Sequence, residues 1–135
     1  MADLLIHLDR LFHNAKTLKA LTDGAGVDLV GVTKCFCGDP KIAELFLRAG
    51  IRTLADSRLG NLSKLSGLPG KRMLLRLPAL SEAAETVAAA DVSIISHVRT
   101  AQRLSDCAID QNRGHDVILM VDLGDLREGI FFEEN

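Results

Sequence analysis

The sequence predicts a parallel α/β protein, in which helices cover a sheet of parallel strands. Short apolar runs alternate with stretches whose apolar residues recur every three or four positions, the spacing of one helix face. The apolar runs are nearly continuous rather than alternating with polar residues, which indicates strands buried on both faces. Short connections rich in glycine, proline and aspartate separate these segments. Together these three patterns favour repeated strand–helix–strand units.

The first helix is predicted to start at Asp9 and to end at Gly24 and Gly26. Its apolar residues fall on one face: Leu11, Phe12, Ala15, Leu18 and Leu21. A strand is expected next, at residues 28–33. The second helix has signals at both ends, because Asp39 can cap it, Pro40 suits its first position and Gly50 suits its stop.

Four more predicted strands follow, each separated from the next by a helical pattern. The expected segments are a strand at 51–55, a helix at 59–65, a strand at 73–77 ended by Pro78, a helix from Ser81, a strand at 92–95, a helix with Val98, Ala101, Leu104, Ala108 and Ile109 on one face, and a strand at 117–123. Five such strands fit either an open doubly wound sheet or part of an eight-stranded barrel, and periodicity does not choose between them.

Composition describes one globular domain over residues 1–135, with 47% hydrophobic and 25% charged residues. The formal net charge is -2 and no basic block is present, which argues against nucleic-acid binding. The apolar runs are too short to span a bilayer, and the N-terminus lacks the order of a signal peptide, so we expect a cytoplasmic protein with no membrane partner.

Three cysteines are too few, and odd in number, for a disulfide framework. Cys35 and Cys37 lack the spacing and the second ligand pair of a metal site, so we expect no metal and interpret both as small buried side chains. Cys37 stays a candidate pocket residue because it is close to Lys34. The histidines are assigned no chemistry; His97, after the fourth strand, is either a pocket wall or the first turn of a helix.

Lys34 is the first candidate for chemistry. It follows the apolar run at 27–32 and precedes the Gly-Asp-Pro turn at 38–40. The carboxyl ends of parallel strands are where α/β proteins keep their functional groups, so a primary amine there suits a Schiff base. A solvated lysine, or one paired with a carboxylate, is the alternative.

Six segments of the chain match one known pattern in order: LIHLD at 5–9, HNA at 13–15, GVTK at 31–34, ADSR at 55–58, LLRLP at 74–78 and VDLGDLREG at 121–129. They resemble the N-terminal barrel part of the alanine racemase family, closest to its ornithine racemase-like branch. The resemblance implies a partial (β/α)8 TIM barrel of the fold type III pyridoxal-phosphate family, with about five parallel strands and covering helices. It also implies an isomerase of amino-acid metabolism, a racemase that depends on pyridoxal 5′-phosphate.

The resemblance assigns roles to particular residues. Lys34 matches the Schiff-base lysine, which anchors the cofactor and acts as a base at the α carbon of the amino-acid substrate. Arg127 matches the arginine of a Val-Asp-x-Gly-x-x-Arg-x-Gly segment that reaches the phenolic oxygen of the cofactor ring; its alternative is a loop arginine paired with Asp122 or Asp125. Further cofactor-binding candidates at strand ends, with a solvated or ion-paired loop residue as the alternative, are Arg76, Ser57 and Arg58.

Two other functions are weighed against the racemase. One is a non-catalytic pyridoxal-phosphate binding or homeostasis protein, a one-domain relative with the same lysine. Its pattern tends to place a lysine near Arg127 and differs through residues 56–58, so both segments favour the racemase. The other is an unrelated parallel α/β binding domain in which Lys34 is incidental, which requires the match of several motifs to be chance.

The sequence also indicates that residues 1–135 are a truncated barrel segment. Residues 131–135 begin a new apolar pair without a closing helix, and barrel enzymes hold phosphate with loops after strands seven and eight. The chain has no tyrosine, whereas alanine racemases take a second base, a tyrosine, from a C-terminal domain. We therefore expect the isolated chain to be weak or inactive, and we expect its open barrel edges to drive self-association, as a homo-oligomer.

Overall fold

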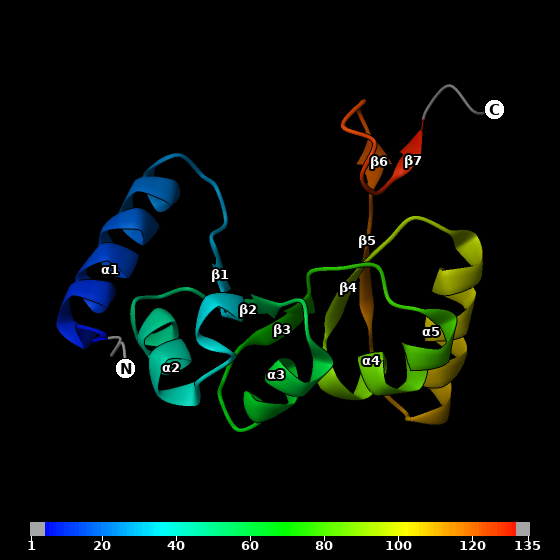
Figure 1. Ribbon diagram of the computed structural model, residues 1–135, viewed down its shortest axis with the longest axis horizontal. Coiled ribbons are helices and arrows are strands. Elements are labelled where there is room, and N and C mark those ends of the chain that lie inside the picture. Colours follow the sequence, from blue (N-terminus) through cyan, green and yellow to red (C-terminus); the bar gives the residue numbers. More distant parts are fainter. Residues whose placement is uncertain (1–4, 132–135) are drawn as a thin grey trace.

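The computed structural model describes residues 5–131. Five parallel strands form one sheet in the order β1-β2-β3-β4-β5, which is also their order in the sequence (Figure 1). They are β1 (Val30–Val32), β2 (Thr53–Asp56), β3 (Lys71–Leu74), β4 (Val92–Ile95) and β5 (Asp116–Leu119). A doubly wound sheet reverses its strand order at a switch point, whereas a barrel adds each strand beside the previous one. The sheet is therefore part of a (β/α)8 barrel.

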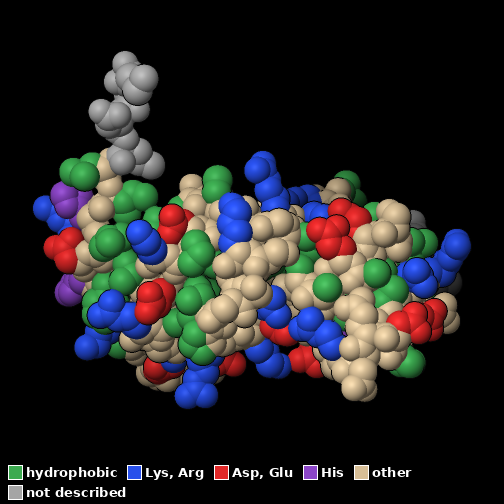
Figure 2. All heavy atoms as spheres, turned by 90° about the horizontal axis from the view of Figure 1, so that it is seen from below, with side chains coloured by type: hydrophobic (Ala, Val, Ile, Leu, Met, Phe, Trp, Pro, Cys, Tyr) green, Lys and Arg blue, Asp and Glu red, His purple; other side chains and the backbone are tan. Residues whose placement is uncertain are grey.

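Helices connect the strands and follow the sheet in sequence order across Figure 1. They are α1 (Leu8–Gly24), α2 (Pro40–Arg48), α3 (Leu59–Lys64), α4 (Ala83–Ala89) and α5 (Val98–Asp110). No helix in the described part of the chain is long and apolar enough to cross a membrane. On the face shown in Figure 2, basic and acidic side chains are intermixed rather than gathered by sign.

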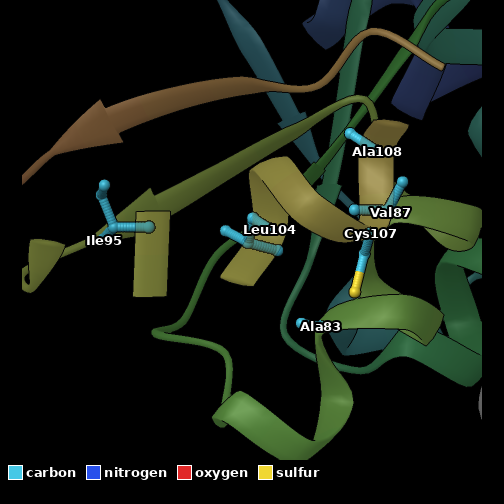
Figure 3. Close-up of a cluster of buried hydrophobic side chains, with 6 residues drawn as sticks. All are labelled: Ala83, Val87, Ile95, Leu104, Cys107 and Ala108. Atoms are coloured by element: carbon cyan, nitrogen blue, oxygen red, sulfur yellow. The ribbon is translucent and has the colours of Figure 1, made fainter. Parts of the chain in front are cut away.

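The sheet has two apolar faces. On the outer face, strand residues pack against the helices: Leu54 belongs to a cluster with Ala43 of α2, and Leu74 to one with Leu62 of α3. Figure 3 shows the third outer cluster, between β4, α4 and α5, which consists of Ala83, Val87, Ile95, Leu104, Cys107 and Ala108. Alternate strand residues form a separate inner-face cluster of Ala55, Met73, Val92 and Ile94.

The second helix confirms its predicted boundaries. The Asp39 carboxylate accepts hydrogen bonds from the backbone nitrogens of Lys41 at 2.8 Å and Ile42 at 3.4 Å. Pro40 occupies the first turn, and Gly50 follows the helix with a φ of 97°. The Asp39 carboxylate thus satisfies backbone nitrogens that have no partner within the helix. The start of this helix could be predicted because its signal lies in adjacent residues.

The first helix differs from its prediction at its start. His7 precedes the helix and Asp9 lies inside the first turn, so the prediction that Asp9 is the cap is wrong. The helix packs against α2, where the Arg48 guanidinium carbon lies 5.3 Å from the centre of the Phe12 ring. Ala15 is its buried residue. Two residues of the predicted apolar face are exposed, Leu18 and Leu21, because α1 stands at the end of the row of helices rather than over the middle of the sheet.

The strand boundaries also differ from the prediction, by up to two residues at either end of β1 and β2 and by more at β3 and β5. β3 ends at Leu74 rather than at 77, because Leu75 and Leu77 leave the sheet but still pack on the inner-face cluster. The predicted strand at 117–123 is interrupted at Met120, after which β6 (Val121–Asp122) pairs in parallel with β7 (Ile130–Phe131). Residues 132–135, part of the segment that suggested truncation, lie outside the described residues.

The helices before β4 and β5 start and pack differently from the prediction. A 3₁₀ turn at Leu80–Glu82 leads into α4, so the regular helix begins two residues after Ser81. In α5, Val98 and Ile109 are 71% and 75% exposed, although the sequence pattern placed both on the apolar face. Leu104 and Ala108, from the same predicted face, are buried. The buried stripe of α5, Leu104, Cys107 and Ala108, is therefore narrower than its apolar stripe.

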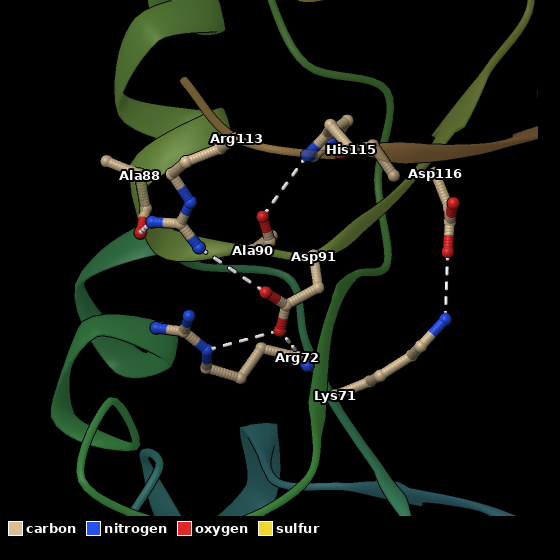
Figure 4. A network of polar contacts seen from close by, with 9 residues as sticks. Lys71, Arg72, Ala88, Ala90, Asp91, Arg113, His115 and Asp116 are labelled. Carbon is tan, nitrogen blue, oxygen red and sulfur yellow. Dashed lines mark hydrogen bonds and ion pairs between the residues drawn. The ribbon is translucent and has the colours of Figure 1, made fainter. Parts of the chain in front are cut away.

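A polar network joins the amino ends of β3, β4 and β5 (Figure 4). Lys71 and Asp116 form an ion pair of 2.8 Å across these strands. The Asp91 carboxylate accepts a hydrogen bond from the Arg72 backbone nitrogen at 2.8 Å, and it lies 3.4 Å from an Arg113 guanidinium nitrogen. This edge lies opposite the carboxyl ends of the strands, so the network holds the sheet without entering the region of Lys34.

His115 belongs to the same edge. Its Nδ1 lies 3.2 Å from the Ala90 carbonyl oxygen, and its Nε2 lies 2.9 Å from the Ser93 hydroxyl. A carbonyl only accepts, so Nδ1 carries the hydrogen and Nε2 accepts from Ser93. Burial lowers the pKa of His115, although the Ala90 hydrogen bond acts in the opposite direction. His115 therefore has a structural role at this edge.

Candidate functional site

The candidate residues follow the carboxyl ends of neighbouring strands. Lys34 opens a 3₁₀ turn, Lys34–Phe36, two residues after β1, and Ser57 directly follows β2. Val32 pairs with Ala55 in the sheet, so the segments that continue from these two residues leave the same edge side by side. Arg76 follows β3 by two residues. Three neighbouring strands thus bring Lys34, Ser57, Arg58 and Arg76 to one rim.

The Lys34 side chain is exposed, and its amine forms no hydrogen bond or ion pair with any residue between 5 and 131. Of the alternatives for this residue, the pairing with a carboxylate is thus absent from the described structure. A Schiff base requires that the amine can reach a carbonyl group, and no contact of the Lys34 side chain within residues 5–131 prevents this.

The turn around Lys34 is held by its own backbone. Phe36 and Gly38 each donate a backbone hydrogen bond of 3.2 Å to the Thr33 carbonyl, and Cys37 donates one of 3.3 Å to the Lys34 carbonyl. Cys37 has a left-handed conformation with a φ of 56°. Cys35 and Cys37 are both exposed, so the prediction that they are buried is wrong. They belong to the rim turn rather than to the strand before it.

Arg76 is engaged in a bidentate ion pair. Its two terminal nitrogens lie 2.8 Å and 2.9 Å from the Glu82 carboxylate oxygens, and its Nε donates to the Ser57 carbonyl at 2.8 Å. The hydrogen bond from Arg76 lowers the pKa of Glu82, as does one from the Ala79 backbone nitrogen. Arg76 thus connects the ends of β2 and β3 to the start of α4. The contacts of Arg76 are therefore those of an ion-paired loop residue, the alternative to a cofactor-binding role.

Ser57 and Arg58 are less constrained. The Arg58 backbone nitrogen donates to Asp56 at 2.9 Å, while its exposed guanidinium forms no bond within residues 5–131. Ser57 is half-buried, and its hydroxyl likewise has no hydrogen-bond partner in the described part of the chain. Both side chains are free to contact a bound molecule at this rim.

Arg127 lies at the other end of the sheet, in the loop between β6 and β7 beyond β5 (Figure 1). Asp122 is buried and accepts hydrogen bonds from the backbone nitrogens of Gly124 at 2.8 Å and Leu126 at 3.2 Å. These bonds, that of Gly124 first, lower the pKa of Asp122. Gly129 has a φ of 130°, and a Cβ there would overlap the Asp122 backbone nitrogen.

The fixed residues of the 121–129 motif therefore have backbone roles, apart from Arg127. Its guanidinium is exposed and forms no ion pair with Asp122 or Asp125 among residues 5–131, so the paired alternative is not what the structure contains. The loop between β6 and β7 therefore exposes the Arg127 guanidinium without an ion-pair partner among residues 5–131. Lys34 follows β1 and Arg127 follows β5, the two end strands of the sheet. In a flat sheet they would lie far apart, whereas the curvature of a barrel turns both strand ends toward the barrel axis.

Sequence reasoning missed the residue that connects the ends of β1 and β2. Asp56 is fully buried, and its carboxylate accepts hydrogen bonds from the Thr33 hydroxyl at 2.8 Å and from the Asn61 side-chain amide at 3.2 Å. A signal was present, because a carboxylate that ends a buried apolar strand requires hydrogen-bond donors.

His97 lines a hollow formed by residues 78–80 and 97–100, and it also directly precedes the first residue of α5.

Comparison with known proteins agrees with this geometry. The family model described as "Alanine racemase, N-terminal domain" matches residues 6–135. A lysine racemase from Thermotoga maritima is 38% identical over 133 residues, and an ornithine racemase from Acetoanaerobium sticklandii is 39% identical over 132 residues. These matches include 97% and 98% of this chain but only 38% and 37% of the two relatives.

Solved structures show the same fold. An alanine racemase from Clostridium difficile 630 superposes with a TM-score of 0.73 at 19% identity, over 90% of this chain and 32% of that one. PipY from Synechococcus elongatus PCC7942, solved with PLP bound, gives a TM-score of 0.66 at 24% identity, over 81% and 54%. Both likenesses support the partial barrel inferred from the strand order.

Proposed function

Because the chain belongs to the alanine racemase N-terminal domain family, we propose that it carries the Schiff-base lysine of an amino-acid racemase that uses pyridoxal 5′-phosphate. The observation that carries this proposal is Lys34, an exposed amine without a partner in residues 5–131, at the end of the first strand of the barrel. The racemase names of the two curated relatives support the same reaction class.

The described residues fit the covalent attachment of this cofactor, because Lys34 supplies a free amine on a flexible stem. When bound, pyridoxal 5′-phosphate supplies an electron sink for negative charge at the α carbon of an amino acid. Lys34 would anchor it and then hold or return a proton at that carbon. Arg127 would offer a fixed cation to the phenolic oxygen of the ring.

The other rim residues have different parts in this proposal. Ser57 and Arg58 have free side chains and would contact the cofactor or substrate from the end of β2. Arg76 has most of its donors committed to Glu82 and Ser57, so it would shape the rim rather than bind the cofactor itself. The groups that hold the phosphate in a barrel come from loops after later strands than β5.

For the substrate, we propose an amino acid with a second amino group. Both curated relatives are named for such amino acids, lysine and ornithine, at 38% and 39% identity. A non-catalytic pyridoxal-phosphate protein is the second candidate, supported by the likeness to PipY with PLP bound. Arg127 and the ADSR segment favour the racemase over it.

The proposal is tested by labelling the lysine. The purified chain is mixed with pyridoxal 5′-phosphate, reduced with borohydride and digested for mass spectrometry. We expect the label on Lys34 and its loss in Lys34→Ala, but not in Lys41→Ala, which removes another exposed lysine nearby. Equal labelling of wild type and Lys34→Ala would contradict the proposal. Interconversion of D- and L-ornithine or lysine by this chain alone is expected to be weak or absent.

A further inference from the structure

We propose that four residues, one directly after β1, one at the end of β2 and two in α3, form a clamp that fixes the backbone of the Lys34 turn. They would act as positioning residues for the Lys34 amine. The clamp consists of Thr33, Asp56, Asn61 and Lys64. The inference rests on the proposed function, since it concerns the lysine that would carry the cofactor. It assigns to these residues a role that acts through Lys34 without contact to the cofactor or the substrate.

The first arm of the clamp holds the start of the turn. Thr33 immediately precedes Lys34 and is fully buried, and its hydroxyl donates to an Asp56 carboxylate oxygen at 2.8 Å. Its backbone nitrogen donates to the Ala55 carbonyl at 2.8 Å. Asp56 is held in turn by the Arg58 backbone nitrogen at 2.9 Å. The residue before Lys34 is therefore bonded to the end of β2 through both its backbone and its side chain.

The second arm holds the end of the turn. The Lys64 ammonium donates to the Cys37 carbonyl at 2.8 Å and to the Asn61 side-chain oxygen at 3.2 Å. Asn61 closes the clamp, because its amide nitrogen donates to both Asp56 oxygens at 3.2 Å. A continuous series of hydrogen bonds thus runs from Thr33 through Asp56, Asn61 and Lys64 to Cys37, and both sides of Lys34 are tied to it.

A close backbone contact completes the clamp. Gly38 is buried with a φ of 65°, and a Cβ at this position would lie 2.9 Å from the Asn61 carbonyl oxygen and from its Cβ. The turn can therefore approach α3 only with a glycine at 38. Asn61 thus serves the turn twice, through its side chain and through its backbone.

Such a clamp matters because the Lys34 side chain has no partner of its own in residues 5–131. A lysine stem has four rotatable bonds, so the position of the amine depends on where the backbone starts it. Groups that form a covalent bond to a cofactor work best when their supporting residues fix them. Here the support is supplied at residues 33 and 37, and it leaves the amine itself free.

Matched variants separate the clamp from general stability. Thr33→Val keeps the shape of the side chain but removes the hydroxyl, whereas Thr33→Ser restores a hydroxyl. Lys64→Met removes the second arm at an exposed position, and Lys41→Met is its control, because the described structure gives the Lys41 side chain no partner. None of these variants alters Lys34. Urea unfolding of each variant identifies any that fails to fold.

The first readout is hydrogen exchange of the amides of residues 36–39 in the cofactor-free chain. The loss of the side-chain hydrogen bonds of Thr33 or Lys64 is expected to speed the exchange of these amides by about two- to tenfold in Thr33→Val and Lys64→Met. Thr33→Ser and Lys41→Met are expected to exchange like the wild type. Unchanged exchange in both clamp variants overturns the inference, whatever happens to the labelling.

The second readout is the rate at which pyridoxal 5′-phosphate becomes reducibly attached to Lys34, measured against pH. We expect slower attachment in Thr33→Val and Lys64→Met, with rescue by Thr33→Ser. Attachment in both clamp variants at the wild-type rate overturns the positioning role. If the wild type attaches no cofactor at Lys34, the proposed function fails by itself, and the exchange of residues 36–39 alone decides whether the clamp exists.

Discussion

Two carboxylates, one buried and one half-buried, connect neighbouring strands at the two edges of the sheet. Asp56 does so between β1 and β2 at the carboxyl edge, and Asp91 between β3 and β4 at the amino edge. The sequence shows each as a lone carboxylate beside an apolar run. Their partners on the neighbouring strand segments, Thr33 and Arg72, are about twenty residues away, and local spacing gives no sign of these partners. The position of Lys34 and the turn after it were predictable, whereas the clamp around them was not.

At His115 the structure predicts a pH dependence of stability. The unfolded chain binds a proton at this residue near the ordinary pKa of 6.5, whereas burial holds the folded pKa lower. As pH falls below 6.5, the unfolded state therefore gains protons first and the free energy of unfolding decreases. Urea unfolding at pH 7.5 and 5.5 measures this loss, which should shrink in His115→Gln but not in His13→Gln, at an exposed histidine.

Gly129 is predicted to resist substitution. Its φ of 130° and its contact with the Asp122 backbone leave no room for a side chain, so Gly129→Ala should destabilise the β6–β7 pair by about 1–3 kcal/mol. The Ile130 amide, which donates to the Met120 carbonyl at 2.8 Å, reports the change by faster hydrogen exchange. Gly114→Ala is the control, because no atom lies within 4 Å of its added Cβ. Equal effects at both glycines would contradict this account.

Whole elements were predictable where their signals are local. α2 matches its prediction because Asp39, Pro40 and Gly50 set its ends by contacts within the helix itself. β3 was predicted two to three residues too late. Leu75 and Leu77 are partly buried against the inner-face cluster, and the sequence pattern does not distinguish such packing from membership of a strand. The pattern of apolar residues indicates which positions are covered, and in this segment covered positions continue beyond the last residue of β3.

Within α5, burial rather than apolar character is expected to set the cost of a substitution. Leu104 is almost fully buried between β4 and α4, so Leu104→Ala should lower the free energy of unfolding by about 2–5 kcal/mol. Val98→Ala in the same helix should change it by less than about 0.5 kcal/mol, because Val98 is exposed. Urea denaturation measures both, and a comparable loss for the two variants would show that Val98 is covered in solution.

At the scale of the whole molecule, the partial barrel has two open edges. β1 pairs only with β2, and β5 pairs only with β4, among the described strands. Exposed apolar side chains gather on the β5 edge: Val117, Ile118, Leu119 and Val121. The inner-face cluster, by contrast, is mostly buried because the curved sheet packs its residues on one another. The edges, more than the inner face, are therefore the surface on which another strand would pair.

We expect this edge to drive self-association of the isolated chain. Sedimentation velocity should show a weight-average sedimentation coefficient that rises with protein concentration. Ile118→Lys, on the exposed edge strand, should reduce the rise, and Leu21→Lys, on α1, should not. A single monomeric species of unchanged sedimentation coefficient at all concentrations would contradict the expectation.

The strand order also bears on how the chain is made. Val30 pairs with Thr53, and Val92 pairs with Asp116, so each strand finds its partner about twenty residues earlier in the chain. A nascent polypeptide leaving the ribosome can therefore dock every new strand onto one that has already emerged. During assembly from the first strand onward, the two strand edges that stay open to other chains are the β1 edge and the edge of the newest strand.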